Sequence, residues 1–190
     1  MTTHFQIPAI ALLIATAAQA QAEVTIHEDF SAWQAATPGF VTIDFTDLTQ
    51  FTIITDQYSD SGVLFTDGDD VVFGPDFTSF VVDGFGAIGQ GEFNWAFATP
   101  QYSIATHFTG GGQLELLFGG APIYTSPHYS GIEGTFLGFV STLPFDTARI
   151  IDPDDPGVNI DNLYFGVPAP GALGLLALAG MSGPGRRRRG

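Results

Sequence analysis

Two aspartates occupy places where carboxylates could hold a cation inside a β-structure. Asp44 lies in the segment TIDF and Asp161 in the segment NIDNL, which we expect to be the first and last long strands of the chain. Within residues 158–165, the apolar residues before Asp161 and those after it lie on opposite faces, which predicts a bulge or an inward-turned polar residue there. Because Ca²⁺ prefers carboxylate and carbonyl oxygens, Asp44, Asp161 and Asn162 form one candidate site. The alternative is that these side chains cap strand ends or accept hydrogen bonds from loop amides.

Two further segments concentrate carboxylates in expected loops. TDGDDVVFGPD contains Asp67, Asp69, Asp70 and Asp76, and IDPDDPGVNID contains Asp152, Asp154 and Asp155. Either loop could give several oxygens to Ca²⁺, although neither has the EF-hand spacing, which ends in a glutamate. Asp-Gly and Asp-Pro are also common in turns without metal, so ordinary turns are the alternative.

Four aromatic residues are candidates for contacting a sugar ring: Trp95, Tyr102, Tyr124 and Tyr129. Each combines a flat apolar face with a polar group, as sugar recognition requires. The alternative is that they pack in the core, because Phe93 and Phe97 flank Trp95 at the spacing of one strand face.

No residue is assigned a catalytic role. The chain has no cysteine, which excludes thiol nucleophiles, disulfides and cysteine-ligated zinc. Its four histidines lack zinc-site spacing, and the chain contains no Gly-x-Ser-x-Gly nucleophile motif. A glycosidase needs two carboxylates in a cleft. With 20 acidic residues, the sequence neither supports nor excludes such a pair.

The charge is distributed very unevenly along the chain. All 20 acidic residues lie between Glu23 and Asp161, and that stretch has one basic residue, Arg149, so its formal charge is −19. There is no lysine, and the other four basic residues stand at positions 186–189. A body of this charge repels nucleic acid and anionic lipid, so we expect no nucleic-acid partner.

The body predicts an all-β fold. About a dozen short segments are rich in β-branched and aromatic residues and are bounded by Gly, Pro, Asp or Ser, which is typical of an antiparallel β-sandwich. One segment, HEDFSAWQAATPG, predicts a short N-terminal helix with Phe30, Trp33 and Gln34 on its buried face. We therefore expect an antiparallel β-sandwich over residues 23–166.

The two ends differ from the body. Residues 1–22 contain an apolar run over 7–18, followed by Ala-Gln-Ala-Gln-Ala, which predicts a secretory signal peptide cleaved by signal peptidase. Residues 167–190 begin with a Pro-rich turn, continue as an 11-residue apolar run and end with the arginines. Such a run spans roughly half of a bilayer core, so it predicts a transient inner-membrane contact. The arginines would stay on the cytoplasmic side.

This order of turn, apolar helix and arginine cluster resembles a PEP-CTERM sorting signal of Gram-negative bacteria. The resembling residues are Val167, Pro168, Ala169, Pro170, Arg186, Arg187, Arg188 and Arg189, with alanine where glutamate is usual. The resemblance implies that an exosortase removes the tail and releases the protein to the envelope or the exterior. The body segments FSAWQAATPGFVTIDFTDL and VNIDNLYFG also resemble the exported jelly-roll domain that often accompanies this tail.

These observations favour a non-enzymatic function. We expect an exported cell-surface or extracellular-matrix protein that binds exopolysaccharide through a jelly-roll domain. The alternatives are a secreted polysaccharide-active hydrolase and a purely structural matrix component. Signal peptidase and an exosortase-type enzyme are the expected processing partners. No cofactor is assigned, and a structural Ca²⁺ is the one candidate.

Overall fold

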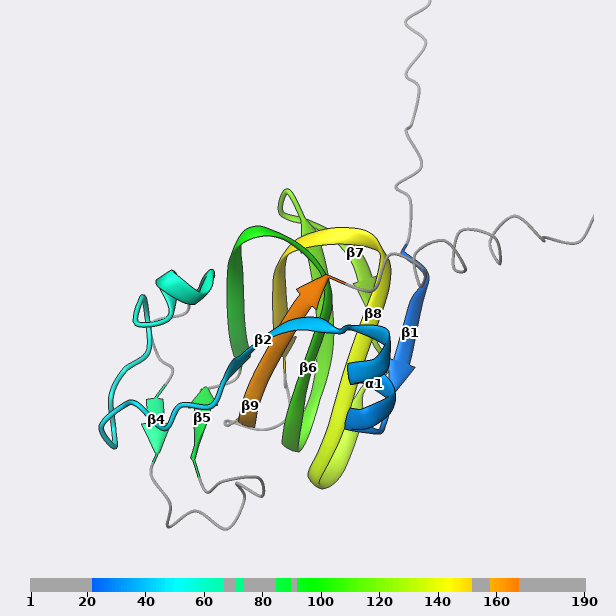
Figure 1. Ribbon diagram of the computed structural model, residues 1–190. Helices are drawn as coiled ribbons and strands as arrows, with labels where there is room; N and C mark the ends of the chain where they lie inside the picture. The colour runs from blue at the N-terminus through cyan, green and yellow to red at the C-terminus, as the bar shows by residue number, and fades with distance from the viewer. Residues whose placement is uncertain (1–21, 67–70, 74–84, 90–91, 152–157, 168–190) are drawn as a thin grey trace, which may run out of the picture.

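The chain folds as an antiparallel β-sandwich with one α-helix, which confirms the expected fold class (Figure 1). The computed structural model describes residues 22–66, 71–73, 85–89, 92–151 and 158–167. Its elements are β1 (Val24–His27), α1 (Phe30–Ala36), β2 (Gly39–Ile43), the 3₁₀ turn η1 (Ser59–Ser61), β3 (Val63–Phe65), β4 (Val71–Phe73), β5 (Gly86–Gly89), β6 (Glu92–Phe118), β7 (Ala121–Thr125), β8 (Tyr129–Ile151) and β9 (Val158–Val167).

Strands β6 and β8 are long enough to run through both layers. The first and the last parts of β6, residues 92–96 and 113–117, both pair with residues 147–151 of β8. The middle of β6, residues 103–112, pairs instead with residues 129–140 of β8. Figure 1 shows both strands arching over one end of the molecule as they pass between the layers.

The two layers differ in their remaining strands. In the front sheet, β1 pairs with residues 138–141 of β8. Strand β9 pairs with the middle of β6 on one side and with β2 and β5 on the other. Strand β4 completes this sheet beside β5. In the back sheet, β3 pairs with the start of β6, and β7 pairs with its end.

The main core lies between the two sheets. Alternate residues of each strand point inward, as the period-two pattern of the sequence predicts. In β6 the expected face of Phe93, Trp95 and Phe97 is buried. The other large members of this core include Phe45, Ile104, Leu114, Leu116, Phe139, Phe145, Ile150, Ile160, Leu163 and Phe165.

A second, smaller core covers the outer face of the front sheet. Asp29 caps the start of α1 by accepting a hydrogen bond from the Ala32 N–H at 2.9 Å. The helix buries Trp33 completely, packed with Ala105, Phe136, Val140 and Tyr164 of the sheet. Phe30 and Trp33 thus form the docking face as expected, but Gln34 is exposed, and Ala36 is the residue that packs there instead.

The strand boundaries differ from the sequence expectations in a systematic way. Segments expected to be separate strands merge into β6 and β8, because irregularities in the register of these two strands absorb the turn residues. Two such irregularities lie between Ala96 and Gln101 and between Phe108 and Gly110. Residues 51–55, expected to be a strand, form none of the elements above, and β1 and β5 were not expected. Residues 79–82, whose sequence SFVV also favours a strand, lie outside the described residues.

Gly138 is required for docking of α1. A Cβ atom at this position would lie 2.4 Å from Cδ1 of Trp33. We therefore predict that Gly138→Ala lowers the free energy of unfolding by about 1–3 kcal/mol, as overpacking does elsewhere. Urea unfolding followed by tryptophan fluorescence measures this change.

Gly39→Ala is the matched control, because a Cβ there meets nothing within 4 Å. Its free energy of unfolding should stay the same or rise by about 0.4–1 kcal/mol. Equal stability of the two variants would show that Trp33 does not rest on Gly138.

Candidate functional site

Strand β9 contains a bulge at the position where the sequence pattern changes phase. Thr106 of β6 pairs with Leu163, and the next residue, His107, pairs with Asp161, so Asn162 is the extra residue. Asn162 has φ +59°, a conformation that asparagine tolerates better than most residues. The predicted bulge is therefore confirmed.

Both polar residues at this bulge are buried. Asp161 is 0% exposed and Asn162 is 3% exposed. The backbone carbonyl of Asn162 accepts a hydrogen bond from Thr106 Oγ1 at 2.7 Å. The side-chain Oδ1 of Asn162 is also buried, and it accepts no hydrogen bond from the described residues. A buried acceptor of this kind usually has a water or ion partner.

Asp44 lies near the bulge but in a different environment. It follows Ile43, which pairs with Leu163, the residue after Asn162. Asp44 is exposed, and its Oδ1 accepts hydrogen bonds from the N–H and the hydroxyl of Thr46, at 3.2 and 2.9 Å. Asp44 therefore bonds a loop amide, as the alternative interpretation held.

The described residues contain no group of three or more His, Asp or Glu side chains arranged to hold a metal ion. The acidic loop residues Asp67, Asp69, Asp70, Asp76, Asp152, Asp154 and Asp155 lie outside those residues. The calcium site at Asp44, Asp161 and Asn162 thus stays a prediction.

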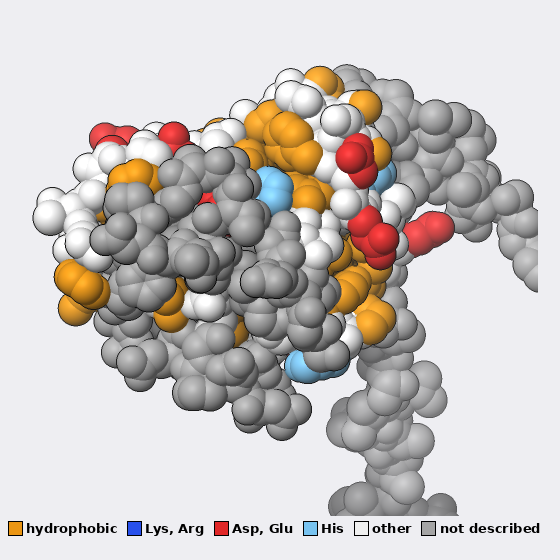
Figure 2. Space-filling view, turned by 90° about the horizontal axis from the view of Figure 1, so that it is seen from below, with side chains coloured by type: hydrophobic (Ala, Val, Ile, Leu, Met, Phe, Trp, Pro, Cys, Tyr) orange, Lys and Arg blue, Asp and Glu red, His pale blue; other side chains and the backbone are white. Residues whose placement is uncertain are grey.

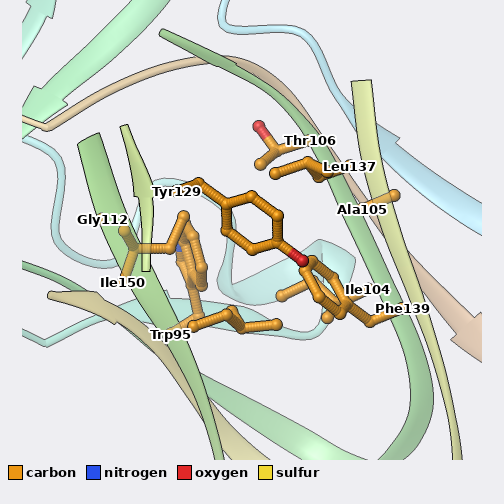
Figure 3. A pocket seen from close by; sticks show the side chains of 10 residues that line it. Trp95, Ile104, Ala105, Thr106, Gly112, Tyr129, Leu137, Phe139 and Ile150 are labelled. Carbon is orange, nitrogen blue, oxygen red and sulfur yellow. The ribbon is translucent and has the colours of Figure 1, made fainter. Parts of the chain in front are cut away.

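The four candidate sugar-binding aromatics do not form one surface. Trp95 is completely buried, so its ring face packs in the core instead of meeting solvent. Tyr129 is half-buried and lies among the side chains that line a small cavity, together with Trp95, Leu137 and Phe139 (Figure 3). This cavity has a volume of about 20 Å³, enough for about one water molecule and far too small for a sugar ring.

Tyr124, on β7, lies near Tyr129. Tyr102 lies on β6. Both residues are half-buried. Burial raises the pKa values of Tyr124 and Tyr129 above the usual range for tyrosine. The proposed sugar contacts of Tyr102, Tyr124 and Tyr129 thus stay predictions.

The outer face of the back sheet carries polar residues that the sequence analysis did not single out. Asn94 pairs with Arg149, Arg149 pairs with Glu115, and Glu115 pairs with Thr125, so four side chains cross four strand segments in one row. We call Asn94, Arg149, Glu115 and Thr125 the polar row. The alternation of buried and exposed residues along β6 could have indicated these positions. Asn94 and Glu115 each stand between two buried core residues, so their side chains point to the outer face.

The centre of the polar row is held by an ion pair. Arg149 Nε and Nη2 both contact Oε2 of Glu115, at 2.8 and 2.7 Å. The Arg149 side chain is 35% exposed and that of Glu115 is 17% exposed. Both planar groups are thus oriented, while part of each remains accessible from outside.

Acidic side chains dominate the charged groups elsewhere on the surface. Figure 2 shows Asp and Glu side chains on the face seen from below Figure 1, and no Lys or Arg among the described residues of that face. Arg149 is the only lysine or arginine between positions 1 and 185.

A buried tyrosine anchors the loop after β2. Tyr58 is 6% exposed and donates a hydrogen bond to Asp47 at 2.7 Å. Burial raises the pKa of Tyr58, and the hydrogen bond and negative charge of Asp47 raise it further. Burial has the opposite effect on a base, and it lowers the pKa of His27.

The expected sorting motif of Val167, Pro168, Ala169, Pro170 and the four arginines begins at the last residue of β9. Val167 ends β9 and pairs with Gly39, whereas residues 1–21 and 168–190 lie outside the described residues. In the part of the chain that is described, no helix has the length and apolar character needed to span a membrane.

Comparisons with known proteins give only a partial structural likeness. No family model matches the chain, and no curated protein matches it. Two solved structures of variants of CBM29-2, titled as studies of ligand recognition by Family 29 Carbohydrate Binding Modules, align with TM-scores of 0.41 and 0.40.

These two alignments have 11% and 13% sequence identity and cover 68% and 63% of this chain and 94% of each module. A structure titled Carbohydrate binding module family29 aligns at 13% identity and a TM-score of 0.33, over 56% of this chain and 75% of its own. Likeness at this level assigns no ligand to this chain.

The raised pKa of Tyr58 predicts a loss of stability in alkali. Tyrosine titrates near pH 10 in an unfolded chain, and the folded pKa is higher. Stability from this group is therefore complete below about pH 10 and is lost as the pH rises further. Thermal unfolding between pH 9 and 11.5 should show a falling Tm in the wild type.

The Tyr58→Phe variant should have a lower Tm at neutral pH, because it lacks the hydrogen bond to Asp47, and a shallower decline in alkali. Asp47→Asn, which removes only the negative charge, should have an intermediate slope. An equal decline of Tm with pH in all three proteins would show that ionisation of Tyr58 does not cause the loss of stability in alkali.

Proposed function

We propose that this protein is an exported, non-enzymatic protein of the cell surface or extracellular matrix that binds neutral polysaccharide on the outer face of its back sheet. The observation that carries this proposal is the polar row. It presents an amide, a guanidinium, a carboxylate and a hydroxyl on one sheet face.

The geometry of the polar row suits an extended, hydroxyl-rich polymer. Neighbouring strands lie about 4.8 Å apart, so the row is roughly 14 Å long. Sugar hydroxyls both donate and accept hydrogen bonds, and the row offers both kinds of group. Because the Arg149–Glu115 pair is fixed by two contacts to one oxygen, less side-chain entropy is lost when a ligand binds.

Apolar surface lies directly beside the polar row. The adjacent register positions hold Leu64 on β3 and Ala96 on β6, which pair with each other. Leu64 is 41% exposed. A sugar ring needs such a surface for its C–H groups while its hydroxyls bond to the polar row.

The charge of the body determines which polymers this face accepts. With 20 acidic residues and one arginine, the body repels polyanions such as acidic polysaccharides and nucleic acid. A neutral polysaccharide has no charge and is therefore not repelled by the acidic body. This narrows the proposed ligand from exopolysaccharide in general to neutral exopolysaccharide.

Export and sorting are part of the same proposal. The apolar run and small residues of 1–22 support cleavage by signal peptidase, and the tail 167–190 supports processing by an exosortase-type enzyme after a transient membrane contact. Both segments would be removed from the mature protein, leaving the β-sandwich at the surface or in the matrix.

Binding is tested with the full-length chain on immobilised neutral and acidic polysaccharides. We expect retention on a neutral polymer and none on an acidic one. Asn94→Ala, and the double variant Arg149→Met with Glu115→Gln, should each weaken retention at least tenfold while keeping the wild-type Tm within a few degrees. Gln34→Ala, on the exposed side of α1, is the control and should bind as the wild type does.

Two outcomes would replace this proposal. Lack of retention on every polymer would favour a purely structural matrix component. Release of shorter sugars from a bound polymer would favour the hydrolase. Binding that survives both polar-row variants would place the ligand elsewhere on the molecule.

Processing is tested by the intact mass of the protein recovered from the cell surface or medium. We predict a mass that lacks residues 1–22 or nearly so and also lacks Arg186–Arg189. A mature protein that still carries the arginines would contradict processing of the tail, and one that begins at Met1 would contradict export by a signal peptide.

A further inference from the structure

The polar row has a fifth member at its outer end. Thr66 follows β3, and its N–H donates a hydrogen bond to the carbonyl oxygen of Asn94 at 3.0 Å, so the two residues lie opposite each other. Phe65 is buried and Thr66 is exposed, so the Thr66 side chain points to the outer face, as that of Asn94 does. We call the polar row together with Thr66 the extended row.

The extended row crosses the back sheet from β3 to β7. Its members lie on five adjacent strand segments, in the order Thr66, Asn94, Arg149, Glu115 and Thr125. Four strand spacings of about 4.8 Å separate the first member from the last, so the extended row is roughly 19 Å long. The rings of an extended sugar chain repeat at a distance comparable with one strand spacing. The extended row can therefore contact several consecutive rings.

The hydrogen-bonding groups are continuous across the strands and not along them. On β3 the outward residue next to Thr66 is Leu64, and on β6 the outward residue next to Asn94 is Ala96. A ligand that followed either strand would meet an apolar side chain after a single polar contact. A chain that crosses the strands instead meets a hydrogen-bonding group on each strand segment.

Both ends of the extended row are accessible. Thr66 and Thr125 are exposed and have short side chains, so neither residue blocks a polymer that continues beyond it. The small cavity beside Tyr129 is lined mainly by core residues and is too small for a sugar ring, so it offers no place for a chain end. A face of this shape contacts successive rings and does not enclose the last ring of a chain.

We propose that the extended row binds the interior of a neutral polysaccharide chain, with about four consecutive rings lying across the strands from Thr66 to Thr125. This inference rests on the proposed function, and it adds the part of the polymer that is bound and Thr66 as a further contact. A single hydrogen bond at an exposed site contributes little, because water competes for the same groups. Affinity therefore depends on how many rings the extended row contacts together.

The test is calorimetric titration of the full-length protein with oligosaccharide series prepared from linear neutral glucans, mannans and galactans. In the series that binds, Kd should fall at least tenfold from the disaccharide to the tetrasaccharide and change less than about twofold for longer chains. A hexasaccharide that is reduced at one end and carries a benzylidene group at the other should bind as tightly as the unmodified hexasaccharide.

Variants at the end and at the centre of the extended row should respond differently to chain length. Thr66→Ala keeps the backbone N–H that bonds to Asn94 and removes only the hydroxyl at one end. It should weaken tetrasaccharide binding at least threefold and leave the disaccharide Kd unchanged, because a disaccharide can occupy the rest of the row. The double variant Arg149→Met with Glu115→Gln should weaken binding of every length.

Thr25→Ala is the matched control, because Thr25 is an exposed threonine on β1 of the front sheet. Its Kd values should equal those of the wild type for every oligosaccharide. All variants should keep the wild-type Tm within a few degrees, which separates a lost contact from a lost fold.

Three results contradict binding of the chain interior. The first is a monosaccharide or disaccharide that binds as tightly as the tetrasaccharide. The second is loss of binding by the hexasaccharide modified at both ends, which shows that the site recognises a chain end. The third is a Thr66→Ala protein that binds every length as the wild type does. These results leave the proposed function standing, whereas lack of binding by every series contradicts the proposed function itself.

Discussion

The double pairing of β8 with β6 is the constraint on which this fold depends. Residues 147–151 of β8 lie between two parts of β6, the start and the end, while the rest of both strands pairs in the other layer. One pair of strands therefore sets the register of both sheets, and the core between them forms only when that register is right. We call the paired strands β6 and β8 the frame. The other strands pair with the edges of this frame.

The two outer faces of the frame have different chemistry. The front sheet buries aromatic residues under α1, with Trp33 resting on Gly138. The back sheet carries the Arg149–Glu115 pair in the middle of a row of hydrogen-bonding groups. This asymmetry follows from the alternation of the strands, because the same β6 segments that supply core residues also supply Asn94 and Glu115 to the outside.

The sequence predicted the fold class, the buried face of Phe93, Trp95 and Phe97, and the bulge in β9. All three depend on local period-two patterns, which a single sequence records. It did not predict the fusion of short segments into β6 and β8, since residues such as Pro100 and Gly110 punctuate a strand only when no bulge absorbs them. The polar row was missed for a similar reason. Its four residues come from four strand segments and meet only through pairing of those segments, most of which lie far apart in the sequence. The sugar-binding role expected for Trp95 was wrong because the side chain is completely buried. Its local pattern is the same whether its strand faces a ligand or a core.

The pairing of β9 also has a mechanical consequence. This strand is the last element before the C-terminal tail, and it is hydrogen-bonded on one side to β6 and on the other to β2 and β5. A pull along the strand at Val167 loads both ladders in shear, so that many hydrogen bonds resist together. A pull across β1, an edge strand with β8 as its partner, would instead open its hydrogen bonds one after another. The chain thus leaves the sandwich through its more strongly held strand at the end where its tail continues.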